Sequence, residues 1–367
     1  MKYDDKKSKM IRRARRKIMG NHGKTRIFMD KLIQKIRKKA EETSFSGVVS
    51  IFQAEKEVYS ESLGYADIAN KRKNNIKTKF AIASGTKLFT ALGIGTLIDA
   101  GKLSLESTVR EIFRKDFTFI NSQATISQLL THSSGIWDYY DEDLEIDSEN
   151  FFVDIPWYQL QTPTDYLPLF ENKKPKYLPG ERFSYSNGGF IFLGIILEYI
   201  TGQLYRDYIH SHVFAPAQMT DSGYYAFNQL PENTAYGYKK GQNDIYETNI
   251  YNLPVRGASD GGAYTTTTDL KKFWKALMNN AILSKQLTTI FLSPHVIVDD
   301  PIEYGYGVYI SKFNGMDMFF IVGGDAGVGF DSRYIPEKEL QISIISNTTD
   351  GEEKIRDVIY SNLQKAL

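Results

Sequence analysis

The chain has 367 residues, of which 42% are hydrophobic and 13% aromatic, which is enough for one large domain or two coupled ones. It contains no cysteine, which excludes disulfide-stabilised folds and zinc sites with Cys ligands. No apolar run reaches the roughly 18 residues of a membrane-spanning helix, and no secretory signal is visible. The sequence by itself therefore predicts a cytoplasmic protein.

The net charge of +1 is unevenly distributed along the chain. Residues 1–40 hold 16 Lys or Arg and 3 Asp or Glu, a charge of +13, so the remaining residues carry −12. We therefore expect a basic N-terminal arm over 1–27 on a mildly acidic globule. Such an arm could contact an anionic surface, such as a membrane or an acidic wall polymer, without specific recognition of nucleic acid. The alternative is a solvated, partly disordered leader.

The first half of the chain opens with a helix and a hairpin. Residues 28–43 have the apolar spacing of an amphipathic helix, and 46–53 and 56–66 have the pattern of two hairpin strands. Residues 84–100 are apolar almost all round, which predicts a buried helix that ends at Gly101. A short helix follows within "TISQLLTHSSG". Residues 136–180 are irregular, acidic and aromatic, and so long a connection indicates a functional loop.

The second half supplies two more helices, then strands, then a final helix. The helices are predicted in "GGFIFLGIILEYITGQ", ending near Gly202, and in "TTDLKKFWKALMN". The strands are predicted in "YGYGVYISKF", "DMFFIVG" and "ELQISIISN", and the last helix in "GEEKIRDVIYSNLQKAL". Strands at both ends with helices between predict an α+β fold, with one sheet built from both chain ends. We expect 28–80 and 255–367 to form the sheet-containing α/β domain and 81–254 a mostly helical inserted domain.

A serine and a lysine stand at the start of the buried helix. Ser84 and Lys87 are three residues apart, so on a helix the ammonium group can touch the hydroxyl. Burial and the helix N-terminus both disfavour the charged form and lower the lysine pKa, so the lysine could activate a serine that is inert without a base. The alternative is a helix-capping serine with a snorkelling lysine, since a lone SxxK pattern also arises by chance.

A second pair of polar residues precedes the next apolar helix. In "LPGERFSYSNGGF", Tyr185 and Asn187 are alternate residues of an extended loop, so both can face one cleft. A phenol whose pKa is lowered by an adjacent ammonium could move a proton, and the Asn amide could hold a substrate carbonyl and orient Lys87. The alternative is a turn with a packing tyrosine and an Asx turn.

These segments together resemble the serine β-lactamase and penicillin-binding-protein superfamily, in particular the group with class C β-lactamases, D,D-carboxypeptidases, D-aminopeptidases and related esterases. The resemblance runs from about residue 28 to the C-terminus and is carried by "FAIASGTKLFTALGIGTLIDAGKLSLESTV", "ISQLLTHSSGI", "PGERFSYSNGGFIFLGIILEYITG", "GGAYTTTTDLKKF" and "VGGDAGVGF". It implies an antiparallel sheet flanked by helices, with the cleft between the sheet and a mostly helical domain. Relatives that act on cell wall work outside the membrane, whereas this chain shows no export signal.

Carried over by position, the resemblance implies a role for each motif residue. Ser84 would be the acylated nucleophile and Lys87 its base. Tyr185 would be the general acid/base, and Asn187 the ligand of the substrate amide. No metal or cofactor is implied, and the five histidines lack metal-ligand spacing.

The third motif of that family departs in this chain. Where relatives have Lys-Thr-Gly, His-x-Gly or Trp-x-Gly, "IVGGDAGVGF" aligns best as Val322-Gly323-Gly324. A rival register with Gly323 in the first place puts Asp325 where the glycine belongs and fits less well. Gly324 would allow close backbone approach, and the amide of Asp325 would pair with that of Ser84 as an oxyanion hole. An aliphatic Val322 offers no hydrogen bond to a substrate carboxylate. We therefore expect a poor β-lactamase and carboxypeptidase that prefers a neutral acyl group.

A competing serine lies in "GASDG", which matches the G-x-S-x-G nucleophile turn with Ser259 at its centre. That motif needs a strand before it and a downstream Asp and His. Pro254 interrupts the preceding segment, and only His295 follows. We expect these glycines to form a turn that lines the cleft.

The leading prediction is a serine hydrolase that acts through an acyl-enzyme on a small-molecule amide or ester, as a D-alanyl peptidase, an esterase or a weak β-lactamase. A cell-wall peptide is one candidate substrate. Two alternatives remain. One is a catalytically impaired penicillin-binding or sensor-like module, and the other is a degenerate hydrolase scaffold whose main function lies in the basic arm.

Overall fold

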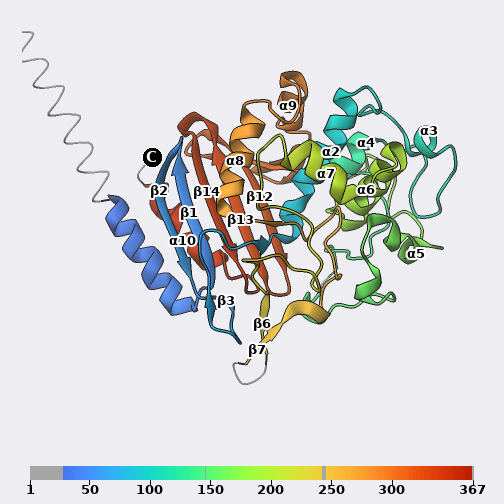
Figure 1. Cartoon of the computed structure of the whole chain (residues 1–367). Coiled ribbons are helices and arrows are strands. Elements are labelled where there is room, and N and C mark those ends of the chain that lie inside the picture. Colours follow the sequence, from blue (N-terminus) through green and yellow to red (C-terminus); the bar gives the residue numbers. More distant parts are fainter. Residues whose placement is uncertain (1–27, 145, 242–244, 366–367) are drawn as a thin grey trace, which may run out of the picture. The chain divides into compact units, whose positions relative to one another are not determined.

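The computed structural model describes residues 28–144, 146–241 and 245–365 (Figure 1). The basic arm predicted for 1–27 lies outside the described residues. The chain divides into two compact units, one made of the chain up to Ser44 together with Lys354–Leu367, the other of Phe45–Glu353. The predicted boundary between a sheet-containing domain and a helical domain stays a prediction.

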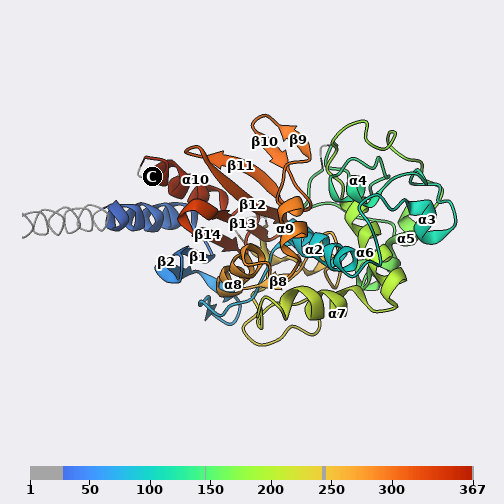
Figure 2. The same cartoon turned by 90° about the horizontal axis from the view of Figure 1, so that it is seen from above.

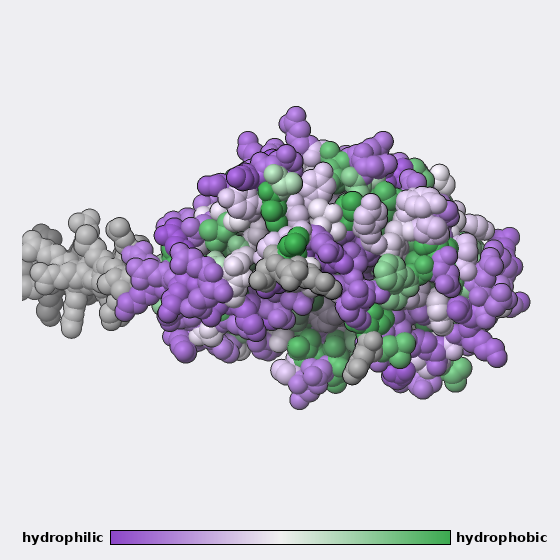
Figure 3. All heavy atoms as spheres, turned by 90° about the horizontal axis from the view of Figure 1, so that it is seen from below, coloured by the Kyte–Doolittle hydropathy of each residue, from purple (hydrophilic) through white to green (hydrophobic). Residues whose placement is uncertain are grey.

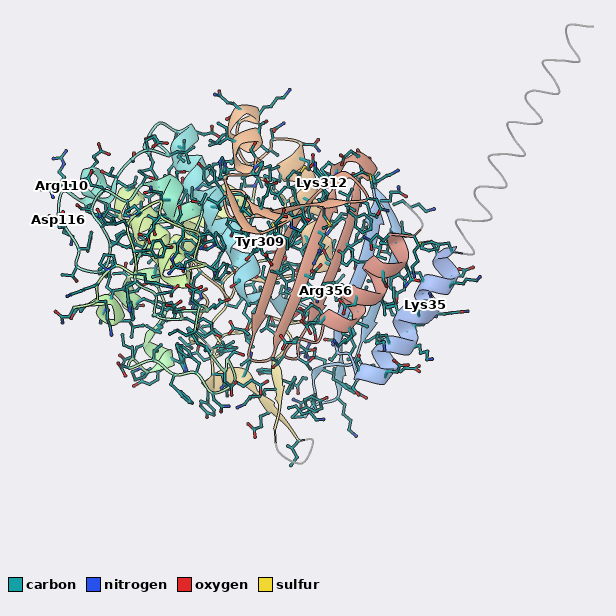
Figure 4. The ribbon with its side chains drawn as sticks, turned by 180° about the vertical axis from the view of Figure 1, so that it is seen from behind. Lys35, Arg110, Asp116, Tyr309, Lys312 and Arg356 are labelled. Carbon is teal, nitrogen blue, oxygen red and sulfur yellow. The ribbon has the colours of Figure 1, made fainter. Side chains whose placement is uncertain are left out.

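The smaller unit contains a helix over 28–43 and all but the first residue of α10 (Glu353–Leu363). Leu32, Ile36 and Ala40 recur every four residues and are buried, which confirms the predicted amphipathic helix. Lys35, labelled in Figure 4, donates a hydrogen bond from Nζ to Asn362 Oδ1 over 2.5 Å. The two helices of this unit are therefore joined by a polar contact.

The larger unit is built on an eight-stranded antiparallel sheet in the order β2-β1-β14-β13-β12-β11-β10-β9. Its strands are β1 (Gly47–Gln53), β2 (Lys56–Leu63), β9 (Val296–Asp299), β10 (Ile302–Tyr304), β11 (Tyr309–Phe313), β12 (Met316–Asp325), β13 (Val328–Ile335) and β14 (Leu340–Ser346). The N-terminal hairpin strand β1 pairs along its whole length with the C-terminal strand β14. This pairing confirms the prediction of one sheet built from both chain ends.

The central strands are covered on both faces. All seven residues of β14 and the first six of β1 are buried, and these strands are rich in Val and Ile. Helix α8 (Thr267–Met278) lies against β1 and β14 (Figure 1), and its Trp274 Nε1 donates to Ser332 Oγ of β13 over 2.9 Å. Three two-stranded ladders complete the strands: β3 (Tyr65–Asp67) with β4 (Arg72–Lys73), β5 (Phe80–Ala81) with β8 (Tyr264–Thr265), and β6 (Tyr238–Lys240) with β7 (Tyr246–Thr248).

The helical part of this unit centres on two apolar helices, α2 (Thr86–Asp99) and α6 (Asn187–Thr201), which contact each other. Figure 2 shows α2 between β12 and α6. The chain after each helix turns at a glycine in the left-handed region, Gly101 and Gly202, both with φ of 68°. Both predicted helix ends are therefore confirmed. No single helix in the described part of the chain is long and apolar enough to cross a membrane.

The remaining helices are short. They are α3 (Val109–Phe113), α4 (Ile126–Leu130), α5 (Leu167–Phe170), α7 (Tyr205–Ile209), α9 (Lys285–Phe291) and the single turns η1 (Ala83–Gly85), η2 (Trp157–Gln159), η3 (Pro163–Tyr166), η4 (His210–Phe214), η6 (Asn249–Tyr251) and η7 (Pro336–Lys338).

Residues 136–180 are mostly irregular, as predicted, apart from η2, η3 and α5. Lys176 fixes this loop by ion pairs to Asp141 and Asp143 at 2.7 and 3.0 Å. On the face shown in Figure 3, apolar residues stand in small groups among polar ones.

Candidate active site

Ser84 lies in η1, the turn that joins β5 to the N-terminus of α2. The residue before it, Ala83, has a φ of +42°, a left-handed conformation that alanine rarely adopts. Hydrogen bonds hold this turn, because the Ala83 carbonyl accepts from Thr86 Oγ1 over 2.7 Å and from the Gly262 amide over 3.2 Å. The N-cap of α2 is Gly85 rather than Ser84, and the Ser84 side chain lines a cavity. The strained backbone therefore presents Ser84 to that cavity.

Lys87 lies one turn further along and is only 1% exposed. Its Nζ donates to Ser84 Oγ over 2.9 Å, to Asn187 Oδ1 over 2.7 Å and to the backbone carbonyl of Asp260 over 2.7 Å. Burial lowers the pKa of Lys87 below its usual value, against the opposing attraction of nearby carboxylates that include Asp260 and Glu142. A buried lysine does not snorkel. The geometry is that of a base in contact with a hydroxyl.

Tyr185 stands beside both groups. Its ring centroid is 4.7 Å from Lys87 Nζ, and its side chain interacts with that of Ser84. Burial raises the pKa of Tyr185 well above its usual value, and Glu142 and Tyr309 add to the rise, whereas the interaction with the Ser84 side chain acts to lower this pKa. Figure 4 shows Tyr309 at the border between sheet and helices. The expectation of a lowered phenol pKa is therefore wrong, because desolvation of the phenolate outweighs the adjacent amine. Tyr185 is a neutral hydrogen-bond donor.

Asn187 is the first residue of α6 and links the catalytic groups to the irregular loop. Its Oδ1 faces Lys87, while its Nδ2 donates to the Tyr140 carbonyl and to Glu142 Oε1, both over 3.0 Å. Its backbone amide donates to Asp138 Oδ2 over 2.6 Å. Tyr185 and Asn187 therefore do converge near Ser84, as the alternation of an extended loop predicted.

Asp138 is a site residue that sequence reasoning missed. It is 4% exposed and accepts hydrogen bonds from the backbone amides of Asn187, Gly188 and Tyr140. Burial raises its pKa to about 7, against the opposing effect of these donors. Asp138 therefore ties the loop to the N-terminus of α6 and fixes Asn187. Its only sequence signal was its place in an acidic stretch without periodicity.

Ser259 does not reach the cavity. It is 0% exposed, its Oγ packs against Gly194 of α6, and its carbonyl accepts from Thr90 Oγ1 over 2.6 Å. Its neighbours Asp260 and Gly261 do line the cavity, in agreement with the predicted turn. The Asp260 carboxylate accepts a hydrogen bond of 2.5 Å from the hydroxyl of Tyr139, and burial raises the Asp260 pKa.

The close approach of β12 to the nucleophile occurs at Gly323. A Cβ atom on Gly323 would lie 2.2 Å from the Ile82 carbonyl oxygen and 2.9 Å from the Ser84 amide nitrogen. On Gly324 it would meet only Asp350 Oδ1, at 3.8 Å. The expectation that Gly324 makes this approach is therefore wrong by one residue, because strand alternation lets only one of two adjacent glycines face the nucleophile.

The one-residue shift changes the register of the third motif. With Gly323 as its glycine, the motif becomes Ile321-Val322-Gly323, and the buried Ile321 takes the first place. Among the described residues that line the cavity, Gly324 and Asp325 are present and Val322 is not. The first place stays aliphatic in either register.

We expect Gly323→Ala to slow acylation of Ser84 by about a hundredfold or more, because its methyl group would force β12 away from the nucleophile's amide. Gly324→Ala, which adds the same atom in open space, should change the rate by less than about threefold. The rate of adduct formation with a fluorophosphonate, followed by intact mass, measures both variants, and thermal unfolding checks their folds. A larger loss in Gly324→Ala would contradict the register given above.

The cavity at Ser84 is small and acidic. It holds about 60 Å³ and adjoins a second hollow of about 70 Å³ that shares Tyr139, Asp260 and Asp325. Glu142, Asp260 and Asp325 supply carboxylates, and no described Lys or Arg appears in either lining. Burial raises the pKa of Asp325 to about 7, with further contributions from Asp260 and Glu142. The motif pattern predicted a role for the Asp325 amide but none for these carboxylates.

Known proteins match over most of the chain. A family model described as Beta-lactamase matches residues 30–366. Penicillin-binding protein 4* of Bacillus subtilis is 29% identical over 332 residues, which cover 85% of this chain and 70% of that protein. Protein flp of Staphylococcus aureus (strain MW2) is 31% identical over 226 residues, 59% of this chain and 42% of that protein.

Solved structures share the fold. A penicillin binding protein from Bacillus halodurans has 38% sequence identity and a TM-score of 0.84, and the match covers 89% of this chain and 99% of that chain. D-amino acid amidase from Ochrobactrum anthropi SV3 has 21% identity and a TM-score of 0.76 over 92% of this chain and 99% of that chain.

Proposed function

Because the chain belongs to the Beta-lactamase family, we propose that this serine hydrolase cleaves an amide or ester through an acyl-enzyme formed at Ser84. The observation that carries the proposal is the 2.9 Å contact between Lys87 Nζ and Ser84 Oγ. Lys87 is buried and its pKa is lowered, so its neutral form can accept the serine proton.

The steps follow from the positions of the donors. Ser84 Oγ attacks the carbonyl carbon while its proton passes to Lys87 Nζ. The amide of Ser84 and a backbone amide of β12 stabilise the oxyanion, and the one-residue shift of the motif transfers the second role from Asp325 to Gly324. Tyr185, a neutral phenol, donates a proton to the leaving group and regains one from Lys87. Water then hydrolyses the acyl-enzyme ester at Ser84, and the same groups exchange their roles as proton donor and proton acceptor.

A second candidate function is a penicillin-binding or sensor-like module, in which the acyl-enzyme persists. The aliphatic residues at the start of the third motif favour it, because they offer no partner to a substrate carboxylate. Labelling with a fluorophosphonate, whose adduct is stable on any activated serine, tests whether Ser84 is a nucleophile, and the time course of the penicillin adduct, followed by intact mass, separates the two functions. A penicilloyl adduct on Ser84 that disappears with time supports the hydrolase, and one that persists supports the sensor. No adduct with either reagent would contradict both.

A histidine at the first place of the third motif should favour anionic substrates. We expect Ile321→His to raise the rate of penicillin acylation relative to that of an uncharged ester by about tenfold, because the imidazole supplies a hydrogen-bond donor for the carboxylate. Val322→His, one residue further along the strand, should leave the ratio unchanged. The two acylation rates are compared in wild type and both variants, with thermal unfolding as a check because Ile321 is buried. If this ratio rose in Val322→His alone, the result would contradict the shifted register and support Val322 as the first residue of the motif.

A further inference from the structure

The carboxylates of the active-site cavity have no positive counterpart among the described residues that line it. Of the three carboxylates there, Asp260 is already engaged by the Tyr139 hydroxyl and is 6% exposed. Lys87 lies nearby but is fully engaged by Ser84, Asn187 and the Asp260 carbonyl. This leaves Glu142 and Asp325 as the groups able to meet a substrate.

Asp325 is held rigidly beside the nucleophile. It ends β12, two residues after the glycine that approaches the Ser84 amide. The turn that follows is anchored on both sides, since Asn249 Nδ2 donates to the Ala326 carbonyl over 2.8 Å and the Gly327 amide donates to Thr349 Oγ1 over 2.9 Å. Among the described residues, the Asp325 carboxylate has no salt-bridge partner. Lys87 attracts this carboxylate but is bonded to Ser84, Asn187 and the Asp260 carbonyl instead. A fixed carboxylate without a bonded cation favours a cationic ligand.

Glu142 comes to the same cavity from the irregular loop. Its Oε1 accepts from Asn187 Nδ2 over 3.0 Å, and this Asn187 also contacts Lys87. The charges of Glu142 and Asp325 are close enough to repel each other, and this repulsion contributes to the raised Asp325 pKa. A positive group between them would relieve that repulsion.

Aromatic rings complete the lining around these carboxylates. Tyr140, Phe151 and Trp157 all line the cavity, with ring centroids 4.6 Å apart for the first pair and 6.3 Å for the second. Aromatic faces attract organic cations. Carboxylates combined with aromatic rings suit an ammonium group on carbon and disfavour a carboxylate-bearing substrate.

We propose that Glu142 and Asp325 form a subsite for an ammonium group close to the scissile carbonyl, so that the enzyme prefers amides or esters that carry a free amine. This substrate class rests on the proposed acyl-enzyme function at Ser84. It goes beyond the expectation of a neutral acyl group, because the cavity selects for positive charge rather than merely against negative charge.

The test compares two p-nitroanilides of equal shape. Alanine p-nitroanilide carries an ammonium group, and isobutyryl p-nitroanilide has a methyl group in its place; both alanine enantiomers are used. We expect a kcat/KM at least about tenfold higher for one alanine enantiomer than for the isobutyryl compound. Asp325→Asn and Glu142→Gln should each lower this ratio by about tenfold. Equal or better hydrolysis of the isobutyryl compound by wild type would overturn the proposal.

A matched control removes a charge from the same loop outside the cavity. Asp147 is exposed, bonds to Asn150 and is not in the lining, so Asp147→Asn should leave the substrate ratio unchanged. An equal fall of the substrate ratio in Asp147→Asn would show that the preference comes from net charge alone, and would contradict the subsite. Labelling of wild-type Ser84 by an uncharged fluorophosphonate distinguishes a failure of the ammonium subsite from a failure of the acyl-enzyme function. Labelling without preference for the amine refutes the subsite alone, whereas no labelling refutes the acyl-enzyme function.

Discussion

Ser84→Ala is expected to abolish hydrolysis of a small activated ester, with a loss of at least about a thousandfold, while Ser259→Ala retains activity. The first change removes the oxygen that Lys87 contacts at 2.9 Å and that lines the cavity. The second removes a fully buried hydroxyl that packs against Gly194, away from the cavity. The initial rate of p-nitrophenyl acetate hydrolysis measures both variants.

The comparison of Ser84→Ala with Ser259→Ala is valid only if both variants are folded. Ser259 Oγ makes only a long hydrogen bond of 3.5 Å to the Ile191 carbonyl, so its loss should cost no more than about 1 kcal/mol of unfolding free energy. Thermal unfolding of the two variants and wild type provides the control. Full activity in Ser84→Ala would contradict an acyl-enzyme at this residue. Loss of activity in Ser259→Ala without a change in unfolding would revive the G-x-S-x-G motif as the nucleophile turn.

The fold could be predicted largely from local patterns. The family, which the motif segments resemble, and the α+β fold with one sheet from both chain ends are confirmed. The fold was predictable because hairpin alternation and all-round apolar helices are visible in the sequence. The ends of α2 and α6 were predictable because Gly101 and Gly202 supply the left-handed conformation that stops a helix.

The register of the third motif could not be predicted with the same methods. Gly323 and Gly324 are adjacent and identical in type, and only the approach of β12 to the Ser84 amide distinguishes them. Asp138 and Glu142 were missed for a related reason. They lie in an irregular loop without periodicity, so their contacts with Asn187 arise only from the tertiary fold.

The direction of the Tyr185 pKa shift depended on burial. The motifs predict that an amine and a phenol face the same cleft, which by itself predicts a lowered phenol pKa. In the folded protein the phenol is buried among Glu142, Tyr304 and Tyr309, and Lys87 is itself driven towards its neutral form. The two motifs identified the partners, but the degree of desolvation set the sign of the pKa shift.

Lys87→Met is expected to slow acylation of Ser84 by at least about a thousandfold, because methionine fills a similar buried volume without a group that accepts the serine proton. In wild type the acylation rate should rise with pH as the ammonium deprotonates, over a range below the usual lysine pKa because burial lowers the pKa of Lys87. This rise should be absent in Lys87→Met. Single-turnover labelling with a fluorophosphonate between about pH 5 and 9, followed by intact mass, measures both profiles.

The same pKa shift predicts a stability difference of known sign. Because the pKa of Lys87 is lowered in the folded state, the unfolded chain binds more protons between that pKa and the usual value, so wild-type stability rises with pH over this interval relative to Lys87→Met. Lys102→Met, at an exposed position just after α2, should change neither the rate profile nor this pH dependence. A rise in acylation rate that survives in Lys87→Met would assign the titrating base to another group, and Lys87 would then only position Ser84 and Asn187.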